Sequence, residues 1–249
     1  MAATSGRGRR GKDGGGSRAA ASGRTRRPAP PRRSGPRDTG SAAPVTLPPG
    51  PFRLGAVEGA TPGKWIDVWS QRLPEIPLEL SRIGLADQRA ALLGTTDAPA
   101  AVDAALIRLP VDTAGLHVIP LYEEVAVVVC AADSSLTAAD ELTLDDLAGE
   151  VVLAPRGAPA APDVPGAIAS RVGAPADVAE AIATVAAGVG VVIVPMSLAR
   201  LHHRKDVAHR PLRGVPPSPV ALAWPAPDTS PLVEAFIGIV RGRTANSSR

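Results

Sequence analysis

The stretch 185–195, which reads VAAGVGVVIVP, constrains the fold more than any other part of this 249-residue chain. Ala, Val and Ile recur at helical spacing over 178–187, and Gly188 suits the left-handed conformation that ends a helix. The four branched residues at 191–194 leave no polar face for solvent, so this strand is expected to be covered on both sides. We therefore predict a helix that passes tightly into a buried strand of a layered α/β sheet.

The residues before 108 predict an alternation of strands and helices. Thr61 is expected to cap a helix whose first position is Pro62, and later prolines end that helix before the next strand. The order strand, helix, strand, helix, strand predicts parallel pairing. The expected elements are strands at 52–57, 78–83 and 102–107, and helices at 62–73 and 86–93.

The second half of the chain predicts another group of strands, joined to the first by long connections. Residues 117–131 are too long for one strand without a bend, and Pro120 lies where that bend is expected, so we predict a strand pair that leaves one lobe for another. Residues 155–176 are rich in Ala, Pro and Gly and predict no regular element. The other expected elements are helices at 143–147, 178–187, 197–202 and 231–243, and strands at 151–154, 191–194 and 220–224, of which the last is the returning crossover.

The first fifty residues differ in composition from the rest. Residues 1–38 hold eleven Arg or Lys against two Asp, so the remainder is net acidic although the whole chain carries +3. Without apolar periodicity this segment does not offset the entropy of ordering, and we predict a disordered basic arm over 1–50. Its arginines predict salt-sensitive contacts with nucleic-acid phosphates and little base reading. The alternatives are a solubilising extension or a start codon placed too early.

The sequence also bears on compartment and redox chemistry. The first forty residues contain no apolar segment of the kind a secretory signal needs, and the apolar run at 185–196 is too short and glycine-broken to span a bilayer. We therefore expect a cytoplasmic protein without a membrane partner. The single cysteine, Cys130, excludes a disulfide framework or a cysteine metal site within one chain, and is expected to be a small buried apolar side chain.

Six segments occur in an order and spacing that this chain shares with a known family. They are FRLGAV at 52–57 with the Thr61-Pro62 helix start, VDAALIRLP at 102–110, LHVIPLYEEVAVVV at 116–129, LTLDDLAGEVVL at 142–153, VAAGVGVVIVP at 185–195 and SPLVEAFIGIVR at 230–241. Over roughly 52–244 the chain resembles the effector-binding domain of LysR-type transcriptional regulators.

The resemblance implies an α/β, two-lobed fold like that of type 2 periplasmic binding proteins. Each lobe would be a mostly parallel sheet flanked by helices, and two crossover strands would join the lobes. Lobe I is expected at about 52–120 and 225–244, lobe II at about 121–224, and a flexible tail at 245–249. The family also carries an N-terminal winged helix-turn-helix, whereas this chain has the basic arm, so sequence-specific DNA binding is not implied. The sequence of 155–175 matches the helix and strand that the family has at this position less well than the other segments do.

In such a fold a ligand is expected between the lobes, at the carboxyl ends of the strands and against helix N-termini. Thr61 is the first candidate, together with backbone donors from Ala60 to Gly63, and the alternative is a helix cap alone. Arg108 follows the third strand, and Arg156 has the equivalent place in the second lobe. Either guanidinium could pair with a small organic acid or with an amino-acid-like effector, or be a solvated rim charge.

Two further segments are assigned from the family pattern. Val189 and Gly190 are expected to line the cleft through their backbone, although tight packing alone explains the glycines. The helix with Trp65 and Trp69 has the position that helps to form an antiparallel dimer in LysR-type proteins. A homodimer contact on this helix is therefore one expectation, and packing in the core is the other.

The sequence predicts no metal site, cofactor or catalytic group. His202 and His203 begin a basic cluster, but adjacent helical residues point about 100° apart, so this is expected to be a solvated helix end. His117 and His209 have no Cys, Asp or Glu at ligand spacing. The chain also lacks a nucleophile elbow, a phosphate loop and a zinc motif.

Three functional hypotheses follow. The first is a cytoplasmic sensing domain that closes around an anionic or zwitterionic metabolite and acts in transcription regulation through association with a partner or as a dimer. The second is a nucleic-acid-associated protein that binds non-specifically through its basic arm. An enzyme that uses the cleft is the third and the weakest.

Overall fold

The computed structural model describes residues 47–171, 173–227 and 229–242, and the strands of these residues form two sheets. Most of the expected basic arm, over 1–46, and the expected tail at 245–249 lie outside the described residues. Leu47 is half-buried against the first core, so the described part begins with a packed side chain. Both lobes belong to one compact unit of the chain.

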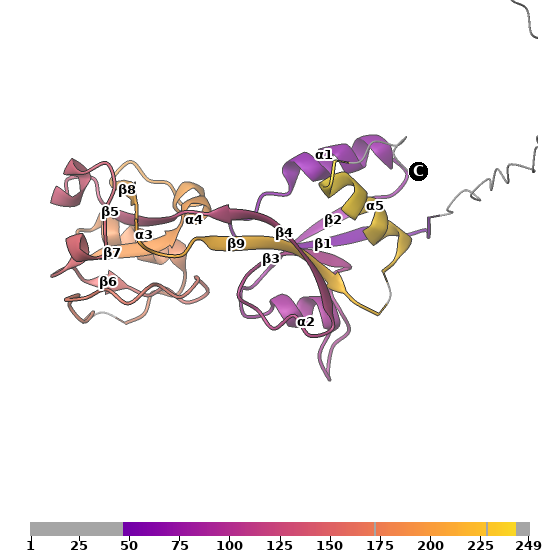
Figure 1. Ribbon diagram of the computed structural model, residues 1–249, viewed down its shortest axis with the longest axis horizontal. Coiled ribbons are helices and arrows are strands. Elements are labelled where there is room, and N and C mark those ends of the chain that lie inside the picture. Colours follow the sequence, from indigo (N-terminus) through magenta and orange to yellow (C-terminus); the bar gives the residue numbers. More distant parts are fainter. Residues whose placement is uncertain (1–46, 172, 228, 243–249) are drawn as a thin grey trace, which may run out of the picture. The chain divides into compact units, whose positions relative to one another are not determined.

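The first sheet has five described strands in the order β2-β1-β3-β9-β4 (Figure 1). The parallel pairing expected from the alternation of strands and helices is confirmed, because β1 pairs in parallel with both β2 and β3. The strand β9 is antiparallel to both of its neighbours. The elements are β1 (Phe52–Val57), α1 (Gly63–Arg72), β2 (Leu78–Ile83), α2 (Gln88–Leu93), β3 (Ala104–Arg108), β4 (Leu116–Glu124), β9 (Ser218–Pro225) and α5 (Pro231–Val240).

Helices cover both faces of this sheet, which explains the apolar composition of its central strand. Every residue of β3 is buried. On one face α1 and α5 enclose an aromatic cluster, in which the Phe52 ring lies 4.7 Å from Trp69 and 5.1 Å from Phe236 between ring centroids. On the other face Leu92 of α2 packs with residues of β3 and β9.

The second sheet has four described strands in the order β6-β7-β5-β8. Its strands β6 and β7 are parallel, and β5 is antiparallel to both of its neighbours. The helices α3 and α4 pack on one face, while two short 3-10 helices and neighbouring loops cover the other. The elements are β5 (Ala126–Ala131), 3-10 helices at Ser135–Ala138 and Asp145–Leu147, β6 (Val152–Leu153), α3 (Val178–Ala186), β7 (Val191–Pro195), α4 (Met196–Leu201) and β8 (Val207–Pro211).

The helix-to-strand unit predicted from VAAGVGVVIVP is confirmed. The helix α3 ends at Ala186, Gly188 has a φ of 81°, and all of β7 is buried. Gly190 also has a positive φ, and a Cβ placed there would lie 2.1 Å from the Val151 carbonyl oxygen. The second glycine therefore allows the chain to pass against the strand β6.

The two crossovers between the lobes differ in position from the expected ones, the first lying after Pro120 and the second before residue 224. The register of β4 shifts between Pro120 and Tyr122, but the strand continues to Glu124 and enters the second lobe through Val125. The strand β9 pairs with β4 from Pro225 back to Ser218, so it belongs to the first sheet throughout (Figure 1). Sheet membership thus divides the lobes near 125 and 217, instead of near 120 and 224, because this long antiparallel pairing holds both strands in the first sheet.

One local expectation was wrong, and one strand was missed. Thr61 does not cap α1, because Pro62 takes the cap position without a side-chain hydrogen bond and its carbonyl accepts from the amides of Trp65 and Ile66. The strand β8 was not predicted. Its sequence VAHRP lacks a clear apolar face, and the segment becomes a strand by pairing with β5.

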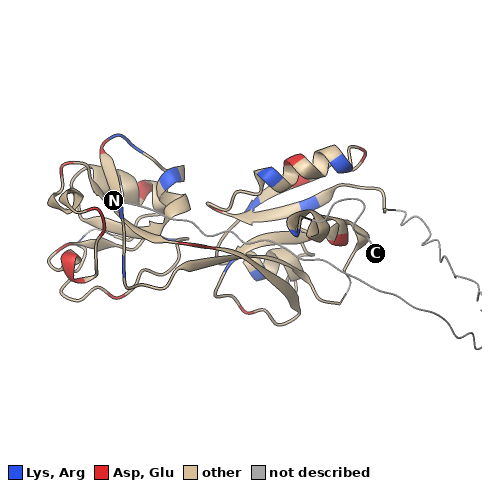
Figure 2. Cartoon of the chain, turned by 45° about the horizontal axis from the view of Figure 1, so that its top comes forward, with Lys and Arg blue, Asp and Glu red and all other residues tan. Residues whose placement is uncertain are grey.

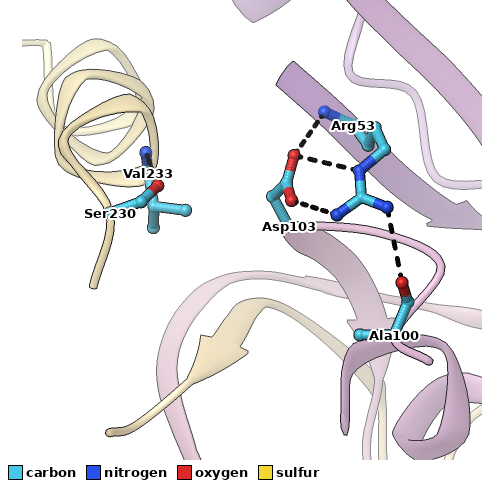
Figure 3. A network of polar contacts seen from close by, with 5 residues as sticks. All are labelled: Arg53, Ala100, Asp103, Ser230 and Val233. Carbon is cyan, nitrogen blue, oxygen red and sulfur yellow. Dashed lines mark hydrogen bonds and ion pairs between the residues drawn. The ribbon is translucent and has the colours of Figure 1, made fainter. Parts of the chain in front are cut away.

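An ion pair fixes the approach to β3 (Figure 3). The Arg53 guanidinium donates to both carboxylate oxygens of Asp103 and to the Ala100 carbonyl, and the Arg53 amide donates to the same carboxylate. The Asp103 side chain raises the pKa of Arg53, chiefly through the hydrogen bond between them. In the same view, the Ser230 hydroxyl accepts from the Val233 amide and caps α5.

We expect Asp103→Ala to lower the free energy of unfolding by about 1–2 kcal/mol, since it removes several hydrogen bonds to a carboxylate while the partly exposed pair is screened by solvent. Urea denaturation followed by circular dichroism measures the change. An unchanged midpoint would show that the pair does not stabilise this edge of the fold.

Charged residues lie mostly on helices and loops (Figure 2). None of the described helices has the length and apolarity that crossing a membrane requires.

Candidate ligand-binding site

Two adjoining cavities lie where the carboxyl ends of β3 and β7 approach each other. The larger one, here called the apolar chamber, has a volume of about 800 Å³. It is lined by the start of α2, by the end of β7 and by residues 108–111, 157–162 and 215–219. The smaller one, here called the polar chamber, has a volume of about 330 Å³. Arg108 lines both chambers, and each chamber takes residues from both lobes.

Arg108 is buried and held on several sides. Its side chain is 2% exposed, its Nη1 donates to the Ser218 hydroxyl at 2.8 Å, and its Nη2 lies 2.9 Å from Glu124 Oε2. The contact with Glu124 is an ion pair by distance, although the N–H bonds are not aligned for a hydrogen bond. The Gln88 amide group pairs with the backbone N–H and carbonyl of Arg108. The charge of Arg108 is therefore already neutralised from within the chain.

Glu124 also binds the second lobe. Its Oε2 accepts a hydrogen bond of 2.7 Å from the Ser197 hydroxyl at the start of α4. On the same side, a Cβ at Gly59 would lie 2.4 Å from Ser197 Oγ, so the loop after β1 lies close against α4. Glu58 Oε1 lies 3.1 Å from His202 Nε2 and 3.4 Å from Arg82 Nη1. These contacts join the lobes beside the polar chamber.

Five charged residues line the polar chamber. Three are cationic and two are anionic, and they are Arg82, Arg108, Arg156, Glu58 and Asp177.

Arg156 is the charged group of this chamber whose side chain has no partner among the described residues. Its backbone amide donates to Pro175, and its guanidinium is exposed.

The N-terminus of α3 meets the polar chamber but is capped by the chain itself. The Asp177 carboxylate accepts from the Glu180 amide at 2.8 Å, and the Glu180 carboxylate accepts in turn from the Ala176 amide. Both residues thus satisfy N–H groups that would otherwise be open to an anion. The positive charge for a ligand in this chamber comes from the arginine side chains instead.

The structure brings two of the six predicted site residues together. Arg108 and Arg156 both line the polar chamber. Ala60 and Thr61 lie in the turn before α1 and line neither chamber.

Val189 and Gly190 also line neither chamber, because they precede the amino end of β7, whereas Ile193–Pro195 at its carboxyl end line the apolar chamber.

Tyr122 lies near the turn that contains Thr61. Burial raises the pKa of the Tyr122 phenol, and the Glu124 carboxylate adds to this rise. The Arg108 charge and, after it, the Thr61 backbone act in the opposite direction and lower this pKa.

Sequence reasoning missed the groups that surround Arg108. The signal for Glu124 was present, because the Glu123-Glu124 pair interrupts a long apolar run, and a carboxylate in a buried strand needs a partner. Gln88 and Ser218 gave no such signal, since their roles depend on contacts between segments far apart in the chain.

The histidines and the cysteine of the described residues form no metal site. Among the described residues, no three His, Cys, Asp or Glu side chains are arranged to hold a metal ion. Burial, followed by the charges of nearby arginines, lowers the pKa of His209. Cys130 is fully buried in β5, as expected, and its burial raises the pKa of its thiol.

Comparison with known proteins agrees with this architecture. The family profile described as LysR substrate binding domain matches residues 46–245. The chain is similar to the BenM effector binding domain with its effector benzoate, at 20% identity and a TM-score of 0.63, over 78% of this chain and 91% of that one. It is also similar to the reduced form of the OxyR regulatory domain from Pseudomonas aeruginosa, at 23% identity and a TM-score of 0.59, over 77% of this chain and 97% of that one.

Against a full-length OxyR variant from the same organism the identity is 24% and the TM-score 0.59, and the match covers 78% of this chain and 66% of that one. These likenesses establish the fold. Among curated proteins, no sequence matches this chain.

Proposed function

The chain belongs to the family of LysR substrate-binding domains, and on that premise we propose that it is a cytoplasmic sensing domain for a small organic acid or amino-acid-like metabolite that acts in transcription regulation. The observation that carries this proposal is the position of Arg156 in a cavity shared by both lobes. A guanidinium without an internal partner favours an anionic ligand there. The two carboxylates that line the polar chamber are engaged within the chain, Glu58 by Arg82 and His202 and Asp177 by the amide of Glu180, which favours binding over catalysis.

Ligand binding is proposed to act by closing the lobes. A ligand that contacts both walls of the chambers binds the closed form more tightly than the open one, and a useful shift of the equilibrium needs a difference of a few kcal/mol. The contacts of Glu58 with His202 and of Glu124 with Ser197 already join the lobes. A movement of the lobes relative to one another is expected to change these two contacts.

Thermal shift in the presence of small carboxylates, amino acids and phosphates tests this proposal. A ligand at a hundred times its dissociation constant stabilises the folded state by about 2.7 kcal/mol. Arg156→Gln should reduce the shift. Arg171→Gln should leave it unchanged, because Arg171 is exposed and lines neither chamber. Equal loss in both variants, or no shift with any of these compounds, would contradict the proposal.

We also propose that the chain forms a homodimer through α1 and the neighbouring strand β2. The strand β2 is an edge of the first sheet with four consecutive exposed residues, and Leu80 among them is 51% exposed. Light scattering after size exclusion should show a dimer that Leu80→Asp dissociates and that Ile168→Asp, at an exposed loop position, leaves intact. A monomeric wild-type chain would refute the dimer.

The basic arm is the basis of the alternative function. Eleven Arg or Lys within residues 1–38 favour phosphate contacts, whatever the lobes bind. Mobility shift of DNA by the full chain and by a chain lacking residues 1–48 separates the two functions. We expect any DNA affinity of the full chain to be lost when the arm is removed. Equal affinity in the truncated chain would exclude the arm as the DNA-binding segment.

A further inference from the structure

The apolar chamber offers a ligand no free polar side chain among the described residues. Gln88, Arg108 and Ser218 are the polar residues of its lining. The Gln88 amide group is bonded to the backbone of Leu85 and Arg108, and the Arg108 guanidinium is shared between Glu124 and Ser218. The three polar side chains are therefore engaged by one another or by nearby groups of the chain, and Arg108 Nη2, which makes no hydrogen bond, is held by the Glu124 charge.

Prolines reduce the number of backbone donors in the same chamber. Seven of its lining residues are prolines, which have no N–H group. They are Pro110, Pro159, Pro162, Pro195, Pro216, Pro217 and Pro219. A hydroxyl, amide or carboxylate placed in this chamber loses its water and finds few new partners, which disfavours its binding. An apolar group gains by leaving water there.

The polar chamber, by contrast, has one charge to offer. Glu58 is engaged by Arg82 and His202, and Asp177 caps α3. Arg108 is neutralised by Glu124. Arg156 remains, so the chamber accepts one anionic group and has no unengaged carboxylate among its described residues for an ammonium group.

We propose that the ligand is a monocarboxylate with an apolar body, whose carboxylate pairs with Arg156 in the polar chamber while its body fills the apolar chamber. The two chambers adjoin at Leu85, Arg108, Gly157 and Pro159, so one molecule can extend from one into the other. This inference rests on the proposed function. The site is expected to distinguish acids by the polarity of the part of the molecule that lies away from the carboxylate.

Calorimetric titration of the full chain with straight-chain acids tests the selectivity. Between butanoate, hexanoate and octanoate we expect the affinity to rise about fourfold for each added methylene. Suberate, 2-aminooctanoate and 1-octanol should each bind at least tenfold more weakly than octanoate. The first adds a second charge, the second adds an ammonium group, and the third lacks the carboxylate.

Variants locate the two halves of the ligand. Arg156→Gln should weaken all three acids by about the same factor, roughly tenfold or more, because only the carboxylate is affected. Ala160→Trp places a ring in the apolar chamber and should remove the dependence on chain length. Ala179→Trp, at an exposed position of α3 outside both chambers, should leave the dependence of affinity on chain length unchanged.

The outcomes separate this inference from the proposed function. Tighter binding of suberate or 2-aminooctanoate, or an affinity independent of chain length, overturns the inference while leaving an Arg156-dependent sensing site in place. The absence of binding by any acid, amino acid or phosphate overturns both.

Discussion

Glu124→Ala is expected to lower the free energy of unfolding by about 3–5 kcal/mol, because it leaves the Arg108 charge buried without its counter-ion. The Arg108 side chain is 2% exposed and that of Glu124 10%, so water does not replace the lost carboxylate. Ser218 remains as a neutral partner, and Ser197 loses the acceptor that links it to the first lobe. Urea denaturation monitored by circular dichroism, with the slope checked for two-state behaviour, gives the value.

The double variant Arg108→Met, Glu124→Leu is the matched control. It removes both charges and retains apolar volume, so most of the stability lost in the single variant should return. A double variant as unstable as Glu124→Ala would show that packing at these positions, and not the unpaired charge, is responsible. A loss below about 1 kcal/mol in Glu124→Ala would mean that solvent reaches Arg108.

Gly190→Ala should destabilise the fold by about 3 kcal/mol. Its φ of 65° disfavours any side chain, and the new Cβ would lie 2.1 Å from the Val151 carbonyl oxygen. That atom is backbone and accepts a hydrogen bond from Val191, so it does not move without disturbing the pairing of β6 with β7.

Gly188→Ala provides the comparison within the same segment. Gly188 also has a positive φ, but nothing lies within 4 Å of the added Cβ, so only the conformational cost of about 1 kcal/mol remains. Thermal unfolding of the two variants should rank Gly190→Ala well below Gly188→Ala. Equal losses would show that the contact with Val151 relaxes freely.

The elements set by local sequence were predictable. The glycines in VAAGVGVVIVP and the branched run after them fix a helix end and a buried strand, because backbone freedom and apolar burial act there over a few residues. The parallel pairing of β1 with β2 and β3 was predictable for a similar reason, because the short helices between these strands determine the direction of the strands. The positions of Arg108 and Arg156 beside the polar chamber were predictable because strand ends gather at one edge of a sheet, whereas ligand binding by them stays a prediction.

The strands and side-chain partners that depend on contacts between distant segments were not predictable in the same way. The strand β8 is defined by its pairing with β5, and the length of β9 by its pairing with β4. The neutralisation of Arg108 requires Glu124 to reach it from the end of a crossover strand, which no spacing along the chain indicates. Ala60 and Thr61 line neither chamber, although Val57 and Glu58 just before them line the polar one. A difference between neighbouring residues of one loop depends on contacts such as that of Gly59 with α4 in the other lobe.

Chemical-shift mapping of the ¹⁵N-labelled full chain during titration with octanoate tests the central claim most directly, namely that one acid binds between the lobes. We predict shifts around Leu85 and Ala86 of the first lobe together with Gly157, Ala160 and Ile193 of the second, and their loss in Arg156→Gln. Shifts confined to one lobe, or unchanged shifts in Arg156→Gln, would contradict it.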